Sequence, residues 1–253
     1  MSRRRLLLIP LVAVLATPVA FGGFVAMVMP KPGAARIQIR DDIIGVLAGH
    51  AYAYVVRRSE HTVLVDAGSD PSGAAILSEL RVQGVTPEDV EAVLITHGHR
   101  DHIGALPLFP RALTYICEAD HALMRGDRLP GGLLPNLMGH LSPMHVLPAE
   151  VRPIVPGTRL SFGDLHFDSV LTPGHTAGSC VYLLGDLLFT GDALLLSGSE
   201  AGPAPAIFSD SSEQSRRALM RLESIPFVAV ADGHGGYAAD GRARYERWLA
   251  AQR

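Results

Sequence analysis

Four side chains of the kinds that bind metal ions stand close together in this sequence: His97, His99, Asp101 and His102. They follow a short apolar run, residues 91–96, which predicts a buried strand with the cluster at its end. A loop at a strand end can turn imidazoles and a carboxylate inward, and neutral imidazole is a preferred ligand of Zn²⁺. The dense pattern H-x-H-x-D-H therefore predicts a metal-binding loop rather than a polar loop with incidental histidines.

Three further candidates occur later, each in a turn after a hydrophobic run: His175, Asp192 and His234. Asp66, in Val63-Leu-Val-Asp66-Ala-Gly68, precedes the first cluster. In this order the motifs resemble those of the metallo-β-lactamase fold superfamily, in its glyoxalase II and lactonase-like subgroup. The resemblance runs from about Ile37 to the C-terminus, and all five family motifs can be placed on this sequence.

The resemblance implies a fold of the α+β class, a four-layer αββα sandwich with metal ions between the edges of two sheets. Two blocks of predicted strands, each followed by helices, agree with this, one before and one after residues 126–148. The capping pattern at Ser211 predicts a helix that reaches Ser224. Asp70 or Ser72 is expected to cap a helix over residues 73–83, with Val82 on its buried face.

The resemblance also implies a ligand set for two Zn²⁺ ions, with iron or manganese as other occupants. His97, His99 and His175 would bind one ion, Asp101, His102 and His234 the other, and Asp192 would bridge them. Two divalent ions, two carboxylates and one bridging hydroxide leave a net charge of about +1, which attracts a carbonyl or phosphoryl oxygen. The hydroxide is available near neutral pH because metal ions lower the pKa of bound water. Asp101 is the expected catalytic residue, as proton acceptor and shuttle.

The predicted reaction is hydrolysis of a small-molecule ester, lactone or thioester. In the family, true β-lactamases lack a bridging aspartate at the position of Asp192, so antibiotic hydrolysis is not expected. Three other readings stay open: an iron-dependent enzyme resembling persulfide dioxygenases, a metal-dependent phosphodiesterase, and a binding module without catalysis.

Several residues near the motifs have two interpretations. Asp66 either orients a ligand histidine or holds its own turn. Thr176 and Ser179 either bond to ligands or cap the local backbone. Cys117 and Cys180 lie in apolar, strand-like runs and are expected to be free and buried rather than paired.

Composition limits the classes of function. The chain has 253 residues, is 48% hydrophobic and 19% charged, and carries a formal charge of −3, which suits one globular domain plus a further segment. This charge is too near neutral for a nucleic-acid-binding surface, so no nucleic-acid partner is expected. Lys31 is the only lysine, which excludes lysine chemistry from the domain that follows it.

The N-terminus carries Arg3, Arg4 and Arg5 and then a charge-free run over residues 6–29. As a helix that run would extend about 36 Å, enough for a hydrocarbon core of about 30 Å. It predicts a transmembrane anchor or a cleaved signal peptide; the anchor is favoured because the small-x-small cleavage pattern is poorly formed. We therefore expect residues 1–30 to contact or cross the membrane and residues 31–253 to form a hydrolase domain outside the cytoplasm.

Residues 126–148 contain four prolines and no sustained period. A long segment of this kind within a compact domain is usually functional or disordered. We expect it to form a lid over the metal loop, with a short helix around Leu133–Leu141. Its histidines, His140 and His145, are expected at the surface or near substrate rather than on metal.

Overall fold

The computed structural model describes residues 31–141, 150–155 and 157–253. The chain divides into two compact units, Met1–Lys31 and Pro32–Arg253, and every element below belongs to the second. The expected N-terminal hydrophobic helix and His145 lie outside the described residues, as does the side chain of His140. Among the helices that are described, none is both long and apolar enough to span a membrane.

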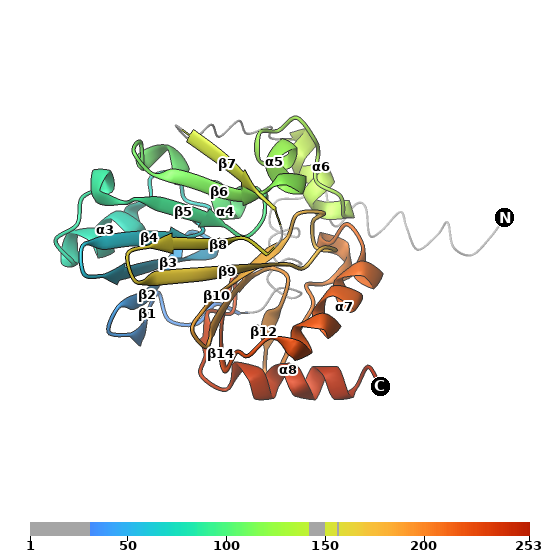
Figure 1. The fold of residues 1–253 in the computed structure, drawn as a ribbon. Helices are drawn as coiled ribbons and strands as arrows, with labels where there is room; N and C mark the ends of the chain where they lie inside the picture. Colours follow the sequence, from blue (N-terminus) through green and yellow to red (C-terminus); the bar gives the residue numbers. More distant parts are fainter. Residues whose placement is uncertain (1–30, 142–149, 156) are drawn as a thin grey trace. The chain divides into compact units, whose positions relative to one another are not determined.

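The first half of the unit forms a seven-stranded sheet in simple sequence order (Figure 1). Its strands are β1 (Arg36–Arg40), β2 (Ile43–Ala48), β3 (Ala51–Arg58), β4 (His61–Val65), β5 (Ala92–Ile95), β6 (Leu113–Cys117) and β7 (Glu150–Ile154). β1 to β4 pair antiparallel through short turns, whereas β4 to β7 run parallel. Parallel strands need crossover connections, and helical segments supply them. These are α3 (Ala74–Val82), η1 (Pro87–Asp89), α4 (Arg100–Ile103), η2 (Leu106–Leu108), α5 (Glu118–Met124) and α6 (Leu133–Leu141).

The second half forms a six-stranded sheet in the order β15-β14-β11-β10-β9-β8. Its strands are β8 (Arg159–Phe162), β9 (Leu165–Leu171), β10 (Cys180–Leu184), β11 (Leu187–Gly191), β14 (Ala229–Asp232) and β15 (Tyr237–Ala238). The one parallel pair in this sheet, β11 with β14, is connected through β12 (Leu195–Ser197), β13 (Glu200–Gly202), η3 (Ala206–Phe208), α7 (Ser212–Met220) and η4 (Arg221–Ser224). The chain ends with α8 (Gly241–Ala250).

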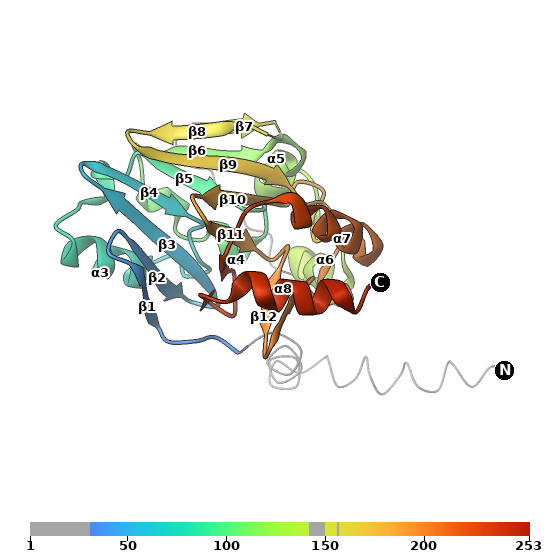
Figure 2. The same ribbon diagram turned by 60° about the horizontal axis from the view of Figure 1, so that its bottom comes forward.

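Three hydrophobic cores separate four layers. Between the sheets, Tyr54 and Phe167 pack on Phe189, with ring centroids 5.3 Å and 6.3 Å apart. Ile76 and Leu80 of α3 are buried in the core on the outer face of the first sheet. Helix α8 lies over the second sheet (Figure 2), and its aromatic side chains, Tyr245 and Trp248, belong to the core on the outer face of that sheet. The predicted αββα sandwich is confirmed.

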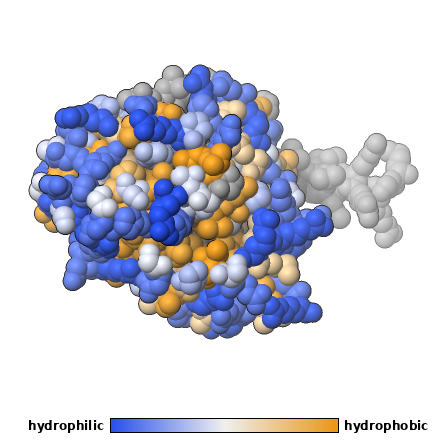
Figure 3. All heavy atoms as spheres, viewed as in Figure 1, coloured by the Kyte–Doolittle hydropathy of each residue, from blue (hydrophilic) through white to orange (hydrophobic). Residues whose placement is uncertain are grey.

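The surface seen from the side of Figure 1 is mostly hydrophilic at its edges and has an apolar area near its middle (Figure 3). Strands β5, β10 and β11 are buried at every position, because both faces of each sheet are covered, and this accounts for part of the hydrophobic content.

Several local predictions need correction. Val82 is 75% exposed, since it lies on the solvent side of α3. The helix is preceded by Gly73 in the left-handed conformation, without a side-chain cap, and Asp70 instead accepts hydrogen bonds from Ser72. The Ser211 cap is confirmed, because its hydroxyl accepts from the Gln214 N–H, and so is the helix over Leu133–Leu141.

Candidate metal centre

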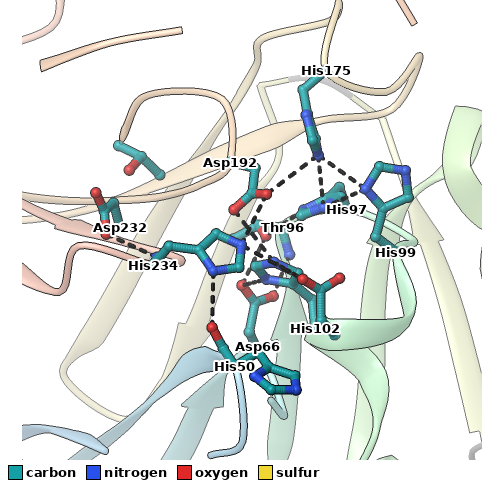
Figure 4. A network of polar contacts seen from close by, with 12 residues as sticks. His50, Asp66, Thr96, His97, His99, His102, His175, Asp192, Asp232 and His234 are labelled. Atoms are coloured by element: carbon teal, nitrogen blue, oxygen red, sulfur yellow. Dashed lines mark hydrogen bonds and ion pairs between the residues drawn. The ribbon is translucent and has the colours of Figure 1, made fainter. Parts of the chain in front are cut away.

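All seven candidate ligands lie in segments that follow strands and come together between the two sheets (Figure 4). The loop after β5 and α4 supply His97, His99, Asp101 and His102, while His175, Asp192 and His234 follow β9, β11 and β14. Two glycines make the approach of these segments possible. A Cβ atom at Gly233 would lie 2.4 Å from Asp192 Oδ1, and one at Gly174, where φ is +135°, would lie 2.1 Å from the Ser215 nitrogen.

His97, His99 and His175 form the first group of ligands, here called the three-histidine cluster. His175 Nε2 lies 3.1 Å from His97 Nε2 and 2.9 Å from His99 Nδ1, and the last two atoms are 3.1 Å apart. Burial lowers the pKa of His97 well below its usual value and that of His175 to about 3, so both rings are neutral. Three imidazole nitrogens that converge at such spacings match one face of a tetrahedron with metal–nitrogen bonds of about 2.0–2.1 Å.

Asp101, His102 and His234 form the second group, here called the acidic cluster. His234 Nε2 and His102 Nε2 lie 3.5 Å and 3.9 Å from Asp101 Oδ2. Burial opposes a charge on His234, but the carboxylates of Asp192 and Asp101 outweigh it and raise its pKa to about 9. The pKa of His102 is also raised well above its usual value, because Asp66, Asp192 and Asp101 overcome the effect of burial.

Asp192 lies between the two clusters. Its Oδ2 is 3.2 Å from His234 Nε2 and 3.5 Å from His175 Nε2, while its Oδ1 is 3.4 Å from His102 Nε2. Burial alone would raise the pKa of Asp192, but His234 and His102 hold it well below the usual range. A buried carboxylate with oxygens directed at both ligand sets has the placement of a bridging ligand.

The residues of this centre fit divalent metal ions. Within the described part of the chain, His102 Nε2 and Asp192 Oδ1 are buried polar atoms without a hydrogen-bond partner, although both face the centre. Leaving a buried polar group unsatisfied costs about 1–3 kcal/mol, which a cation at this point would offset. The donor set of imidazoles and carboxylates suits Zn²⁺.

Asp66 orients His102. Its Oδ1 accepts the Thr96 N–H at 2.8 Å, and its Oδ2 accepts the Thr96 hydroxyl and contacts His102 Nδ1, each at 2.8 Å. These bonds turn His102 Nε2 toward the centre. Of the two interpretations left open, the geometry favours orientation of a ligand, and the left-handed backbone at Asp66, with φ of +58°, belongs to the same arrangement.

His234 is held in a comparable way by main-chain groups. Its Nδ1 lies 2.9 Å from the His50 carbonyl oxygen, which can only accept, so Nδ1 donates and Nε2 is the nitrogen left to bind a metal once the ring is neutral. The buried Asp232 accepts N–H bonds from Leu196, His234 and Gly236. Burial raises the pKa of Asp232 to about 6.

Asp120 is a supporting residue that the sequence analysis missed. It is fully buried in the first turn of α5. Its Oδ2 accepts the Gly98 N–H at 2.9 Å and the Thr176 hydroxyl at 2.6 Å, and its Oδ1 accepts the Gly178 N–H at 2.8 Å. A carboxylate just beyond β6, at the same sheet edge as Asp66 beyond β4, was the available signal.

The remaining residues with open interpretations do not contact the ligands through the bonds described. Ser179 Oγ accepts the Thr176 N–H within the same loop, whereas the Thr176 hydroxyl bonds to Asp120 of α5. Cys117 and Cys180 are free and buried, as expected.

Comparison with known proteins gives the same family as the motifs. A sequence model described as the metallo-beta-lactamase superfamily matches residues 46–234. Metallo-beta-lactamase domain-containing protein 1 of Mus musculus is 33% identical over 179 residues, which cover 68% of this chain and 59% of that protein. The hydroxyacylglutathione hydrolase of Nitrosomonas eutropha is 28% identical over 177 residues, covering 69% of this chain and 56% of that one. The matches thus span less than two thirds of the length of these two relatives.

A solved structure, the Rm3 metallo-beta-lactamase, superposes with a TM-score of 0.66. It is 19% identical, and the match covers 88% of this chain and 94% of that one, which shows a shared fold. Because the family model matches most of its length, this chain belongs to the metallo-beta-lactamase superfamily of metal-dependent hydrolases.

Proposed function

We propose that this chain is a dinuclear zinc hydrolase that acts on an ester, a lactone or a thioester of a small molecule. The observation that carries the proposal is the position of Asp192, whose two oxygens face ligands of both clusters at 3.2–3.5 Å. A relative named hydroxyacylglutathione hydrolase supports an acyl group as the part of the substrate that is attacked.

The two clusters divide the work of holding the ions. The three-histidine cluster offers neutral donors and is buried, which suits a tightly held ion. When bound, two ions would polarise the carbonyl oxygen of the substrate and lower the pKa of water in the site. Asp192 supplies negative charge to both sides, because its low pKa keeps it ionised near neutral pH.

Asp101 is the proposed proton acceptor. Its side chain is 37% exposed, while the other six ligands are buried, so it reaches both the centre and the solvent. Burial would raise its pKa, but His102 and His234 outweigh this and lower it, so the group is a carboxylate at neutral pH. A carboxylate in this position can take a proton from attacking water and return it to the leaving group.

The completeness of the acidic cluster favours hydrolysis over the single-iron alternative. An enzyme with one Fe²⁺ needs only part of this ligand set, yet Asp101, His102 and His234 offer atoms within 4.8 Å of one another. An arrangement with ligands for a second ion supports a two-metal mechanism.

The test is elemental analysis of the full chain purified without added metal, followed by assays with esters, lactones, thioesters, phosphodiesters and β-lactams. We expect two zinc ions per chain and hydrolysis of one acyl substrate class. The matched control is Asp101→Asn, which keeps the shape of the side chain and should keep metal but lose rate. One iron per chain, with oxygen uptake on addition of a persulfide, would replace hydrolysis by oxygenation.

We also propose that the domain lies outside the cytoplasm, on the basis of the Arg3-Arg4-Arg5 flank and the charge-free run after it. Protease added to intact spheroplasts should then remove the domain. Full protection in spheroplasts, with digestion only after lysis, would put the active site in the cytoplasm.

A further inference from the structure

We propose that Asp120 is the positioning residue of the three-histidine cluster and sets how tightly that cluster holds its ion. This inference rests on the proposed two-metal function, and it concerns a side chain that does not itself face the metal centre. Asp120 accepts hydrogen bonds from two loops, one that carries His97 and His99 and one that carries His175.

The bonds reach the ligands through their nearest neighbours in sequence. Gly98, whose N–H donates to Asp120 Oδ2 at 2.9 Å, lies between His97 and His99. Thr176 follows His175 directly and donates its hydroxyl to the same oxygen at 2.6 Å. His97 and His175 are in contact although they are 78 residues apart in sequence. The Asp120 carboxylate therefore connects two loops that are distant along the chain.

The cluster needs such a connection when it holds no ion. Metal binding requires each neutral ring to direct a lone pair at the same point, and these nitrogens lie 2.9–3.1 Å apart, so in that arrangement the rings repel each other until an ion is bound. Hydrogen bonds to a carboxylate are roughly twice as strong as those between neutral groups. Three of them on one buried side chain oppose separation of the loops.

Close packing around Asp120 is independent support. A Cβ atom at Gly178 would lie 2.5 Å from the Asp120 nitrogen, and one at Gly98 would lie 3.1 Å from the Asp120 carbonyl oxygen and 2.9 Å from the Met124 nitrogen. Both loops therefore approach α5 as closely as glycine allows. A change at Asp120 acts directly on the backbone that carries the three ligands.

Arg128 connects Asp120 to a third segment. Its guanidinium lies 3.5 Å from Asp120 Oδ1 and 3.5 Å from Asp210 Oδ2, and the Asp210 N–H donates to the His175 carbonyl at 3.0 Å. The Arg128 side chain is 38% exposed and both contacts are long, so its contribution is small. We assign the main effect to Asp120 and a minor one to Arg128.

Asp232 provides a matched control in the same fold. It is also fully buried and accepts three hydrogen bonds from main-chain N–H groups, but its donors belong to the loop of His234 and to Leu196. Asp232→Asn should therefore disturb the acidic cluster, whereas Asp120→Asn should disturb the three-histidine cluster.

The experiment measures the two Zn²⁺ affinities of the full chain by competition with a chelator, in wild type, Asp120→Asn, Asp232→Asn and His99→Ala. Asp120→Asn should weaken one site about 10–100-fold, the range for loss of an outer partner of a ligand. His99→Ala already disables the three-histidine cluster. In the double variant, Asp120→Asn should therefore change the Zn²⁺ affinity of the acidic cluster by less than about twofold, since effects at well-separated sites add and Asp120 is assigned to the other cluster. Asp232→Asn added to His99→Ala should weaken that remaining site further.

Thr176→Val is the milder variant if Asp120→Asn does not fold. It removes one of the three bonds and should weaken one site by roughly three- to tenfold. Equal loss at both sites in Asp120→Asn, or affinities within about twofold of wild type, would overturn the inference and leave Asp120 as a general stabiliser.

Amide hydrogen exchange separates this inference from the proposed function. In metal-free protein, Asp120→Asn should speed exchange at Gly98 and Gly178, whose N–H groups it bonds in wild type, more than elsewhere. A wild-type chain that binds no metal would refute the two-metal function, and unchanged exchange at these two glycines would refute the role of Asp120.

Discussion

The two ligand clusters share Asp192 and lie side by side, yet they differ in charge and in access to solvent. The three-histidine cluster contains buried rings whose pKa values are lowered, to about 3 for His175. The acidic cluster contains histidines whose pKa values are raised, to about 9 for His234, and a partly exposed Asp101. The difference indicates that one side holds an ion with neutral donors, while the other combines metal binding with proton transfer.

The supporting residues differ in the same way. Asp66 touches the ring of His102 directly, at 2.8 Å, so it fixes the orientation of one ligand. Asp120 touches no ligand ring through the bonds described and holds two loops together instead. Asp66 therefore orients a ligand ring of the acidic cluster, whereas Asp120 holds together the backbone loops that carry the three-histidine cluster.

The largest effect is expected from Asp192→Ala, because this variant removes the ligand that the two clusters share. Both sites should lose metal, because each loses a ligand and the negative charge that keeps the ions close. The hydrolytic rate should fall by more than about 100-fold, which is the upper end of the effect of losing a residue that only supports a ligand. Elemental analysis checks this; two tightly held ions in the variant would show that Asp192 does not bridge.

The next largest effects should distinguish the clusters. His99→Ala removes a ligand, so metal content and rate should fall together. Asp101→Asn keeps the shape but removes a base, so the rate should fall about 10²–10⁴-fold with a smaller loss of metal. Metal content and kcat are measured on both variants. If Asp101→Asn lost metal and rate together, as His99→Ala is expected to, Asp101 would be a metal ligand without a role as base.

A third variant, Asp66→Asn, tests the direct contact of Asp66 with His102. The affinity of the acidic cluster should fall roughly 10–100-fold. The three-histidine cluster should lose less, because Asp66 reaches His97 only through the Thr96 hydroxyl, which lies 3.1 Å from His97 Nδ1. Asp120→Asn is expected to show the opposite distribution. If Asp66→Asn weakened both sites equally, Asp66 would act on the whole loop and not on one ring.

The smallest effect concerns the stability of metal-free protein and has opposite signs for the two clusters. The pKa of His234 is raised to about 9, so its stabilising protonation is complete below about 6.5 and is lost as the pH rises to 9. The pKa of His175 is lowered to about 3, so stability is instead lost as the pH falls from about 6.5 toward 3. Over its whole range, each arm should amount to roughly 3–5 kcal/mol in the free energy of unfolding.

Denaturant unfolding in the presence of a chelator, from pH 3 to pH 9, measures both arms. His234→Gln should flatten the arm above pH 6.5 and leave the lower arm in place. His175→Gln should do the reverse. A wild-type profile without a decline above pH 6.5 would contradict the charge assigned to the acidic cluster.

Ligands and strands were predictable from sequence because their signals are local. The apolar run before Thr96 and the histidine spacing after it predicted β5 and the metal loop. The resemblance to a known family then supplied the division of the seven ligands into two sets.

Asp120 and Asp232, which hold the ligand loops, were not predictable because their hydrogen-bond partners are distant in sequence. Asp120 lies 56 residues from Thr176, and nothing in its own helical turn marks it as different from a solvated carboxylate. Asp232 bonds to Leu196, which is 36 residues away. The burial of Val82 was wrong for a related reason, since a helical period alone does not fix how much of a helix the sheet covers.

The order of the ligands along the chain also affects how the protein is made on the ribosome. The three-histidine cluster has all its members once His175 has been synthesised, whereas the acidic cluster waits for His234, 59 residues later. At about 5–20 residues per second this takes about 3–12 s. Until then the second sheet, whose strand β9 leads to His175, lacks β14 beside β11, so an ion captured early would lie in an unfinished sheet. Late completion of the acidic cluster therefore links full metal loading to the end of folding.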